Sequence, residues 1–299
     1  MNYRKLTAAE ISQLQSNGCR CDDWHRVEIA EPFRPAHYRN VTFSGDIRLG
    51  TTEQPIMRDG KIPMPAGIYD AVIHNCSIGN NVLINRIGNY IADYNIADDV
   101  LIENAGCIRM SGESTFGNGT EVSVLNETGG REVPIYDCLS AHVAYMIAMY
   151  RHDKTLTQHL RALIADYVDS KRSSVGTIGS NVSIVNTSAI TDVFISSHTI
   201  IDGATSLTNG SIISEKDDPV HVGHNVMAED FIMCAGARVE EGAVLVHTFV
   251  GQASSLSRLY SAHDSLFFAN CACENGESAA IFAGPYTVTM HKSSLLIAG

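Results

Sequence analysis

The chain has 299 residues, of which 44% are hydrophobic but only 7% aromatic, so its core must be built from small aliphatic side chains, which suits stacked β-structure. Its formal net charge of −12 argues against nucleic acid as the default partner. The first residues lack the apolar stretch of a signal peptide, no window resembles a membrane span, and the eight cysteines are dispersed, so we expect a cytoplasmic protein without a membrane span.

Residues 1–71 are predicted to form a small N-terminal α/β cap. A short helix is expected over 7–17, because Thr7 and Glu10 fit a capping box and Gly18 is suited to end the helix. Short alternating runs such as "VTFSGDIRLG", broken by proline and glycine, then indicate strands.

A six-residue repeat starts near Val72 and is expected to run through residues 72–131. Its grid positions are Ile78, Ile84, Tyr90, Ile96, Ile102 and Ile108. Such a period is typical of a parallel β-helix, in which three short strands and three corners make one 18-residue coil. Consecutive coils lie one strand spacing apart, about 4.8 Å, so Ile78 and Ile96 are expected to stack on one wall. The fold class is therefore mainly β, a single-stranded parallel β-helix of hexapeptide repeats.

Residues 132–174 interrupt the repeat with helical spacing. Apolar stripes such as Val143 and Ile147, and Leu160 and Ile164, predict an α-helical hairpin that packs on its own coils or on those of a neighbouring chain. The grid resumes over 175–251, with one single-residue slip, at Ile178, Ile184, Ile190, Ile195, Ile201, Leu207 and Ile213. Residues 252–299 follow the grid poorly and predict an irregular continuation. Because the sequence ends on the apolar "LLIAG", we expect a further coil or another chain to cover that end.

The grid resembles the left-handed β-helix of the hexapeptide-repeat transferase superfamily, over residues 72–128 and 175–251. With its helical insertion, the chain also resembles an uncharacterised family of hexapeptide-repeat proteins, a domain of unknown function, from which no activity carries over. The first resemblance implies a homotrimer with sites in grooves between neighbouring chains, and transfer of an acetyl or longer acyl group to a small-molecule substrate. It implies no bound cofactor, but acyl-CoA or an acyl-carrier thioester as co-substrate. A histidine would act as general base.

Three histidines are candidates for that base. His224 lies in "VHVGHNVMAEDF", which resembles the "I-A-H-N-V" phrase around the catalytic histidine of trimeric lipid A-pathway acyltransferases that act on UDP-sugars. His74 in "VIHNCSIGNN" occupies the same register, and His247 in "LVHTFVGQ" lies at a grid corner. Asn225 and Asn75, which follow two of these histidines, are candidate ligand-binding residues. The acids considered for orienting the base are Asp192, Asp202, Glu229 and Asp230.

A basic spot near the end of the sequence is a candidate phosphate-binding site. His291 and Lys292 in "PYTVTMHKSS" can meet a phosphate of a carrier or a sugar nucleotide. The alternative is a loop on a solvated edge.

Two alternatives to acyl transfer remain open. The first is a non-catalytic β-helix scaffold or binding module in which the histidines are incidental. The second resembles the γ-class carbonic anhydrases, which bind metal through histidines in phrases like "V-G-H" followed five residues later by another histidine. Here Glu229 stands at that later place, and His221 and His224 are expected to face opposite sides of a strand, so no metal ligand is predicted.

Overall fold

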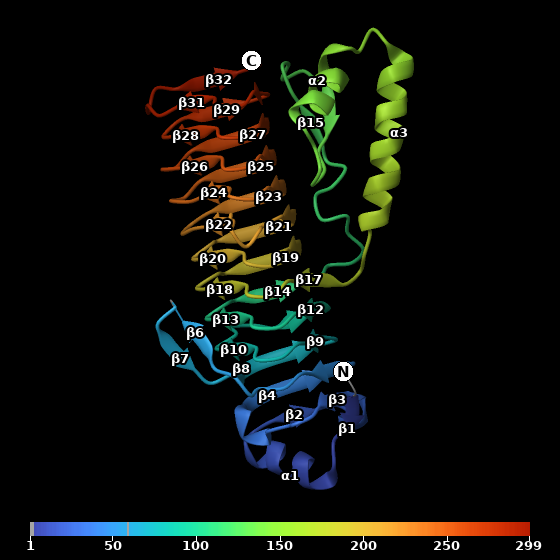
Figure 1. Cartoon of the computed structure of the whole chain (residues 1–299), viewed down its shortest axis with the longest axis vertical. Helices are drawn as coiled ribbons and strands as arrows, with labels where there is room; N and C mark the ends of the chain where they lie inside the picture. Colours follow the sequence, from blue (N-terminus) through green and yellow to red (C-terminus); the bar gives the residue numbers. More distant parts are fainter. Residues whose placement is uncertain (1–2, 59) are drawn as a thin grey trace.

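Short strands stacked in parallel dominate the structure, a computed structural model that describes residues 3–58 and 60–299 (Figure 1). Most of these strands belong to one long sheet, and the start and end of the chain lie at opposite ends of the stack (Figure 1). The described chain is therefore mainly β, as predicted, with a sheet rich in parallel pairs. None of the helices in the described part of the chain is long and apolar enough to cross a membrane.

Three columns of parallel strands run along this stack, which we call the coil stack. Each turn of the chain adds one strand to each column, and each column is named after one inward-facing isoleucine. The Ile84 column contains β10 (Leu83–Asn85), β13 (Leu101–Glu103), β18 (Ser183–Val185), β20 (Ile200–Asp202), β22 (His221–Val222), β24 (Arg238–Val239), β26 (Ser255–Ser257), β28 (Ala272–Glu274) and β31 (Val288–Thr289). The Ile91 column contains β2 (Arg20–Cys21), β11 (Ile91–Ala92), β14 (Cys107–Arg109), β29 (Glu277–Ala279) and β32 (Leu295–Ile297). The Ile96 column contains β3 (Val27–Ala30), β5 (Ile47–Leu49), β9 (Ser77–Ile78), β12 (Tyr94–Ile96), β17 (Gly176–Ile178) and β30 (Phe282–Ala283).

Longer strands bend around a corner and so belong to two columns. Five of them pass from the Ile91 to the Ile96 column: β19 (Ala189–Ile195), β21 (Ser206–Ile212), β23 (Met227–Met233), β25 (Val244–Val250) and β27 (Ser261–Phe267). Two pass from the Ile84 to the Ile91 column: β4 (Tyr38–Ser44) and β8 (Gly67–His74). Most corners are therefore formed within a continuous strand or by a short turn, while longer segments follow β5, β14 and β21.

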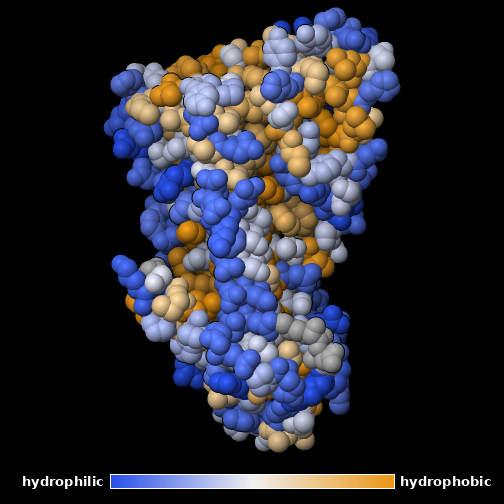
Figure 2. All heavy atoms as spheres, in the orientation of Figure 1, coloured by the Kyte–Doolittle hydropathy of each residue, from blue (hydrophilic) through white to orange (hydrophobic). Residues whose placement is uncertain are grey.

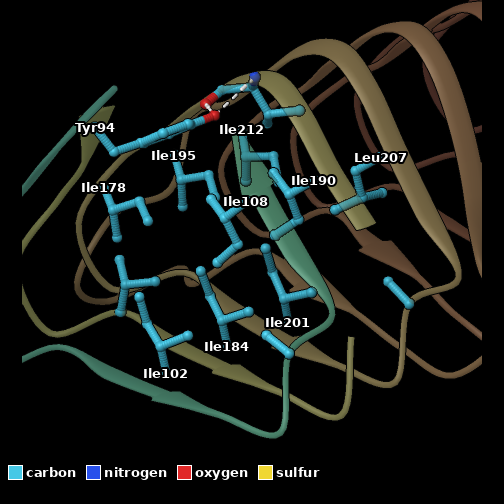
Figure 3. Close-up of a cluster of buried hydrophobic side chains, with 14 of the residues drawn as sticks. Tyr94, Ile102, Ile108, Ile178, Ile184, Ile190, Ile195, Ile201, Leu207 and Ile212 are labelled. Carbon is cyan, nitrogen blue, oxygen red and sulfur yellow. Dashed lines mark hydrogen bonds between the residues drawn. The ribbon is translucent and has the colours of Figure 1, made fainter. Parts of the chain in front are cut away.

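The predicted grid isoleucines fill the inside of the coil stack. Ile84 pairs with Ile102, Ile102 with Ile184 and Ile184 with Ile201, and all four are fully buried. Figure 3 shows this row beside the equivalent rows of the two other columns. Burial of one such side chain stabilises the fold by about 1.5–3 kcal/mol, so the ladders are the main source of stability.

The grid is wrong by one residue at three places. Ile73, Ile91 and Ile212 face the core where Val72, Tyr90 and Ile213 were expected. The reason is that five residues, and not six, separate the core positions across the corner between the Ile91 and Ile96 columns, as from Ile91 to Ile96 and from Leu207 to Ile212. Some coils therefore have 17 residues, as the pairing of Ile178 with Ile195 shows.

One residue at the corner between the Ile91 and Ile96 columns accounts for the shorter coil. Asp192, with φ 57°, makes this corner in β19, and a residue with positive φ occupies the same place in the next four strands. The same spacing continues to Phe267, which pairs with Val250. Beyond it the parallel pairing goes on with changed spacings, 16 residues from Ser261 to Glu277 and 18 from Glu277 to Leu295.

The N-terminal region contains the expected helix and also the first parallel pairs. Helix α1 (Ala8–Ser16) begins with the predicted capping box of Thr7 and Glu10. Short 3₁₀ helices follow at Trp24–Arg26 and Pro35–His37, and β1 (Tyr3–Lys5) pairs antiparallel with β3. Parallel stacking already starts within the segment predicted as a cap, because β2 pairs with β4.

A small hairpin of β6 (Ile56–Arg58) and β7 (Ile62–Met64) covers part of the Ile84 column. Ile56 packs against Leu83 and Leu101 on the outer face of this column. Arg58 and Arg86 both pair with Glu103, which is almost fully buried. Burial by itself would raise the pKa of Glu103, but the two guanidinium groups outweigh it and hold that pKa below its usual value.

The chain between β14 and β17 leaves the coil stack and forms the predicted helical hairpin. It contains an unexpected antiparallel pair, β15 (Glu121–Ser123) and β16 (Glu132–Pro134), and then α2 (Ala141–Met149) and α3 (Lys154–Lys171). Apolar side chains of this insertion pack on outward-facing residues of its own stack, among them Ile232, Phe249 and Leu266. Hydrophobic side chains also gather on the surface over the insertion in Figure 2. Exposed large side chains of the insertion include Tyr145, Met149 and Leu163.

Candidate functional site

The predicted site residues lie at two different corners of the coil stack. His224 and Asn225 follow β22, at the corner between the Ile84 and Ile91 columns. Asn75 and His247, both with positive φ, lie at the corner between the Ile91 and Ile96 columns. We call these the His224 corner and the His247 corner.

The His224 corner holds its imidazole at the surface beside an aspartate of the previous coil. His224 Nε2 is 4.0 Å from Asp202 Oδ2, and 67% of the histidine side chain is exposed. The other ring nitrogen lies against Gly203, where an added Cβ would be only 1.9 Å from Nδ1. Gly203, with φ +78°, therefore leaves the space that the imidazole occupies. Asn225, with φ 60°, donates its backbone N–H to the Gly203 carbonyl at 2.8 Å.

An open cavity of about 350 Å³ surrounds this histidine. Its wall includes Ile200, Asp202, His221, His224, Glu240 and Glu241. His221 and His224 thus line the same cavity, and the expectation that they face opposite sides is wrong because β22 ends at Val222 and the chain turns. Burial and the nearby Arg238 lower the pKa of His221, with Glu240 opposing them.

His74 is held in a hydrogen-bond network that engages both ring nitrogens. Its Nδ1 lies 2.8 Å from Ser44 Oγ, and its Nε2 lies 2.9 Å from Asn75 Nδ2. Asn75 Nδ2 also donates to Asp93 at 3.1 Å, and its Oδ1 accepts the Asp46 backbone N–H at 3.0 Å. In this arrangement His74 has no free nitrogen with which to take a proton.

His247 lies between two carboxylates, one on each neighbouring coil. Its Nδ1 is 3.2 Å from Asp264 Oδ1, and its Nε2 is 3.4 Å from Asp230 Oδ2. His263 Nδ1 is in turn 3.2 Å from Asp264 Oδ2. His263 and Asp264 were not among the predicted site residues, although "SAHDSLF" follows "VLVHTFV" at the 17-residue spacing of the coils.

The insertion runs along the His247 corner and contacts several of its residues. The Ser111 backbone N–H donates to Asp192 at 2.6 Å, and the Gly117 backbone N–H donates to Asn209 at 3.0 Å. Of the acids considered for orienting a base, Asp192 is therefore engaged by the insertion, whereas Asp202 faces His224 and Asp230 faces His247. Glu229 is exposed on β23.

His291 and Lys292 lie far from His224 within one chain. Both are exposed and precede β32, at the C-terminal end of the stack. Four strand pairings separate β22 from β31 in the Ile84 column, a rise of about 19 Å at the usual strand spacing. Both residues lie between β31 of the Ile84 column and β32 of the Ile91 column, which is the His224 corner, but one chain does not bring them close to His224 itself. The phosphate-binding role of these two residues stays a prediction.

Comparison with known proteins identifies relatives of unknown function. The sequence model of the family described as Domain of unknown function (DUF4954) matches residues 3–299. An uncharacterised protein of Treponema pallidum (strain Nichols) is 28% identical over 248 residues, which is 79% of this chain and 34% of that protein. The chain thus spans about a third of the length of this curated relative.

Proposed function

The chain belongs to the DUF4954 family, and from the geometry of the His224 corner we propose that it is an acyltransferase of the hexapeptide-repeat type. In this proposal the coil stack is a left-handed β-helix, and three chains assemble with a groove along each His224 corner. An acyl group passes from a coenzyme A or carrier thioester to a hydroxyl or amine of a sugar or sugar nucleotide.

The observation that carries the proposal is an exposed imidazole in an open cavity, beside a carboxylate of the adjacent coil. A general base needs one nitrogen for the substrate and a partner that stabilises the imidazolium. Nε2 of His224 faces Asp202, although 4.0 Å is too long for a hydrogen bond. Nδ1, which packs beside Gly203, is the nitrogen left for the substrate. A shift of about 1 Å, as when a second chain closes the groove, brings the pair to hydrogen-bond distance. The insertion runs along the His247 corner and not along the His224 corner.

The chemistry then follows from proton transfer at His224. The imidazole takes the proton of the acceptor hydroxyl or amine as that group attacks the thioester carbonyl, and the negative carboxylate of Asp202 stabilises the resulting imidazolium. The tetrahedral intermediate collapses and the carbon–sulfur bond breaks. The leaving thiolate takes the proton from the His224 imidazolium.

The test is thiol release from acetyl-CoA and longer acyl thioesters, measured against a panel of sugars and UDP-sugars. We expect His224→Ala to lower kcat by about 10²–10⁴, and Gly203→Ala to lower it as well, because the new methyl group displaces the ring. His74→Ala serves as a matched control on the other corner. If no donor and acceptor pair gives turnover, or if His224→Ala is as active as the wild type, the acyltransferase proposal fails and a binding scaffold is favoured.

Solution mass by light scattering tests the assembly. A trimeric mass supports the groove between chains, and removal of residues 132–173 should leave it unchanged because the insertion packs on its own stack. A monomeric wild-type protein would contradict a shared groove.

A further inference from the structure

Two histidines and one aspartate converge on the outer face of the stack where β25 and β27 pair. One donor atom from each of His247, His263 and Asp264 can be chosen so that all three lie within 4.8 Å of one another. The two oxygens of Asp264 face different histidines, each at 3.2 Å. A tetrahedral zinc ion with bonds of about 2.0–2.1 Å holds its ligand atoms about 3.3 Å apart. The spacing therefore suits one metal ion with small side-chain movements.

From this arrangement we propose that His247, His263 and Asp264 form a binding site for a divalent transition-metal ion, with zinc as the best match. Two imidazoles and one carboxylate are a donor set that zinc commonly accepts, and they leave a fourth position for water. Non-haem iron(II) uses the same donor types in octahedral geometry, so the coordination number distinguishes the two ions.

Asp230 supports the proposal as a positioning residue for His247. A metal-bound histidine usually donates its other ring N–H to a carboxylate, which fixes the tautomer and the ring orientation. Here Nδ1 of His247 faces Asp264, while Nε2 lies 3.4 Å from Asp230. Asp230 is in turn held by the side-chain amide of Asn209. The chain Asn209–Asp230–His247 thus points the Nδ1 lone pair toward the metal position.

Charge and backbone rigidity favour the same conclusion. The side chains of Asp230 and Asp264 are only 24% and 17% exposed, so two poorly solvated carboxylates lie beside the imidazoles of His247 and His263. A dication offsets their charge more completely than an imidazolium does. His247 and Asp264 occupy the same corner position in paired strands, with φ 47° in both, so the ligands are placed by the stack itself.

The experiment is titration of chelator-treated full-length protein with Zn²⁺ and, separately, with Co²⁺, whose visible spectrum reports the coordination number. We expect one ion per chain and a four-coordinate cobalt spectrum. His263→Gln should weaken binding by more than about 100-fold, and Asp230→Asn by about 10–100-fold. His159→Gln, an exposed histidine on α3, is the matched control and should bind like the wild type.

The variants are chosen so that misfolding does not imitate the result. His263 is 60% exposed, so glutamine there should leave the fold intact, which circular dichroism verifies. A six-coordinate cobalt spectrum would overturn the assignment to zinc in favour of an octahedral ion. Absence of saturable binding tighter than a Kd of about 1 mM, or unchanged affinity in a folded His263→Gln variant, would overturn the site itself.

Discussion

Replacement of Tyr94 by phenylalanine tests how the coil stack is joined across the insertion. Tyr94 in β12 is fully buried, and its hydroxyl donates to the Val193 carbonyl at 2.9 Å and accepts the Val193 N–H at 3.2 Å (Figure 3). The two residues are 99 positions apart in the sequence. Tyr94→Phe keeps the ring and removes only this double hydrogen bond.

Removal of this one oxygen atom is expected to cause a large loss of stability. Val193 is itself fully buried, so water cannot replace the hydroxyl. A buried polar group left without its partner costs about 1–3 kcal/mol, and two such groups remain, so we expect a loss of roughly 2–5 kcal/mol. For a chain of this size that corresponds to a melting temperature lower by about 4 °C or more.

Urea and thermal unfolding, followed by far-ultraviolet circular dichroism, measure this loss. Tyr145→Phe is the control, because Tyr145 is 48% exposed on α2 and its replacement should change stability by less than about 0.5 kcal/mol. If Tyr94→Phe unfolds at the same urea concentration as this control, the hydroxyl does not link the two coils and the reasoning is wrong.

Two further predictions concern the hairpin of β6 and β7 and the insertion. Because the pKa of Glu103 is held below its usual value, its ionised form stabilises the fold above about pH 5, and this contribution is lost as the pH falls through the lowered pKa. Glu103→Gln should therefore be less stable than the wild type at pH 7, and the difference should shrink in melts below about pH 4; a difference independent of pH would contradict the ion pairs. Phe249→Ala opens a cavity under the insertion and should lower the free energy of unfolding by about 3–5 kcal/mol. Hydrogen exchange of the backbone amides should therefore accelerate in α2 but not in β18. Equal protection of α2 in both proteins would show that the insertion is held elsewhere.

The repeat pattern was informative because the core positions are chemically uniform. Ile84, Ile102 and Ile184 are equivalent in sequence and stack in the structure. The pattern failed at Tyr90 and Ile213 because a single left-handed residue shortens the step across one corner from six residues to five, and that shortening depends on backbone angles rather than on hydrophobicity.

The candidate sites were harder to predict than the core because they depend on contacts between coils. Asp202 was considered as an acid, and the structure places it near His224. The approach of Asp264 to His247 depends on the 17-residue spacing, which a strict period of six obscures. The sequence pattern also could not predict that the insertion packs on its own stack, because an apolar stripe on a helix does not specify the surface that covers it.

The direct pairing of β12 with β17 has a consequence for how the molecule folds. Residues 110–175 form an extruded loop, and closing it costs about 2 kcal/mol more entropy than closing an ordinary six-residue corner. Growth of the structure by successive addition of neighbouring turns is therefore slowed at this junction. Once the loop is closed, the junction is held by the pairs β12–β17, β13–β18 and β14–β19 and by the hydrogen bonds between Tyr94 and Val193.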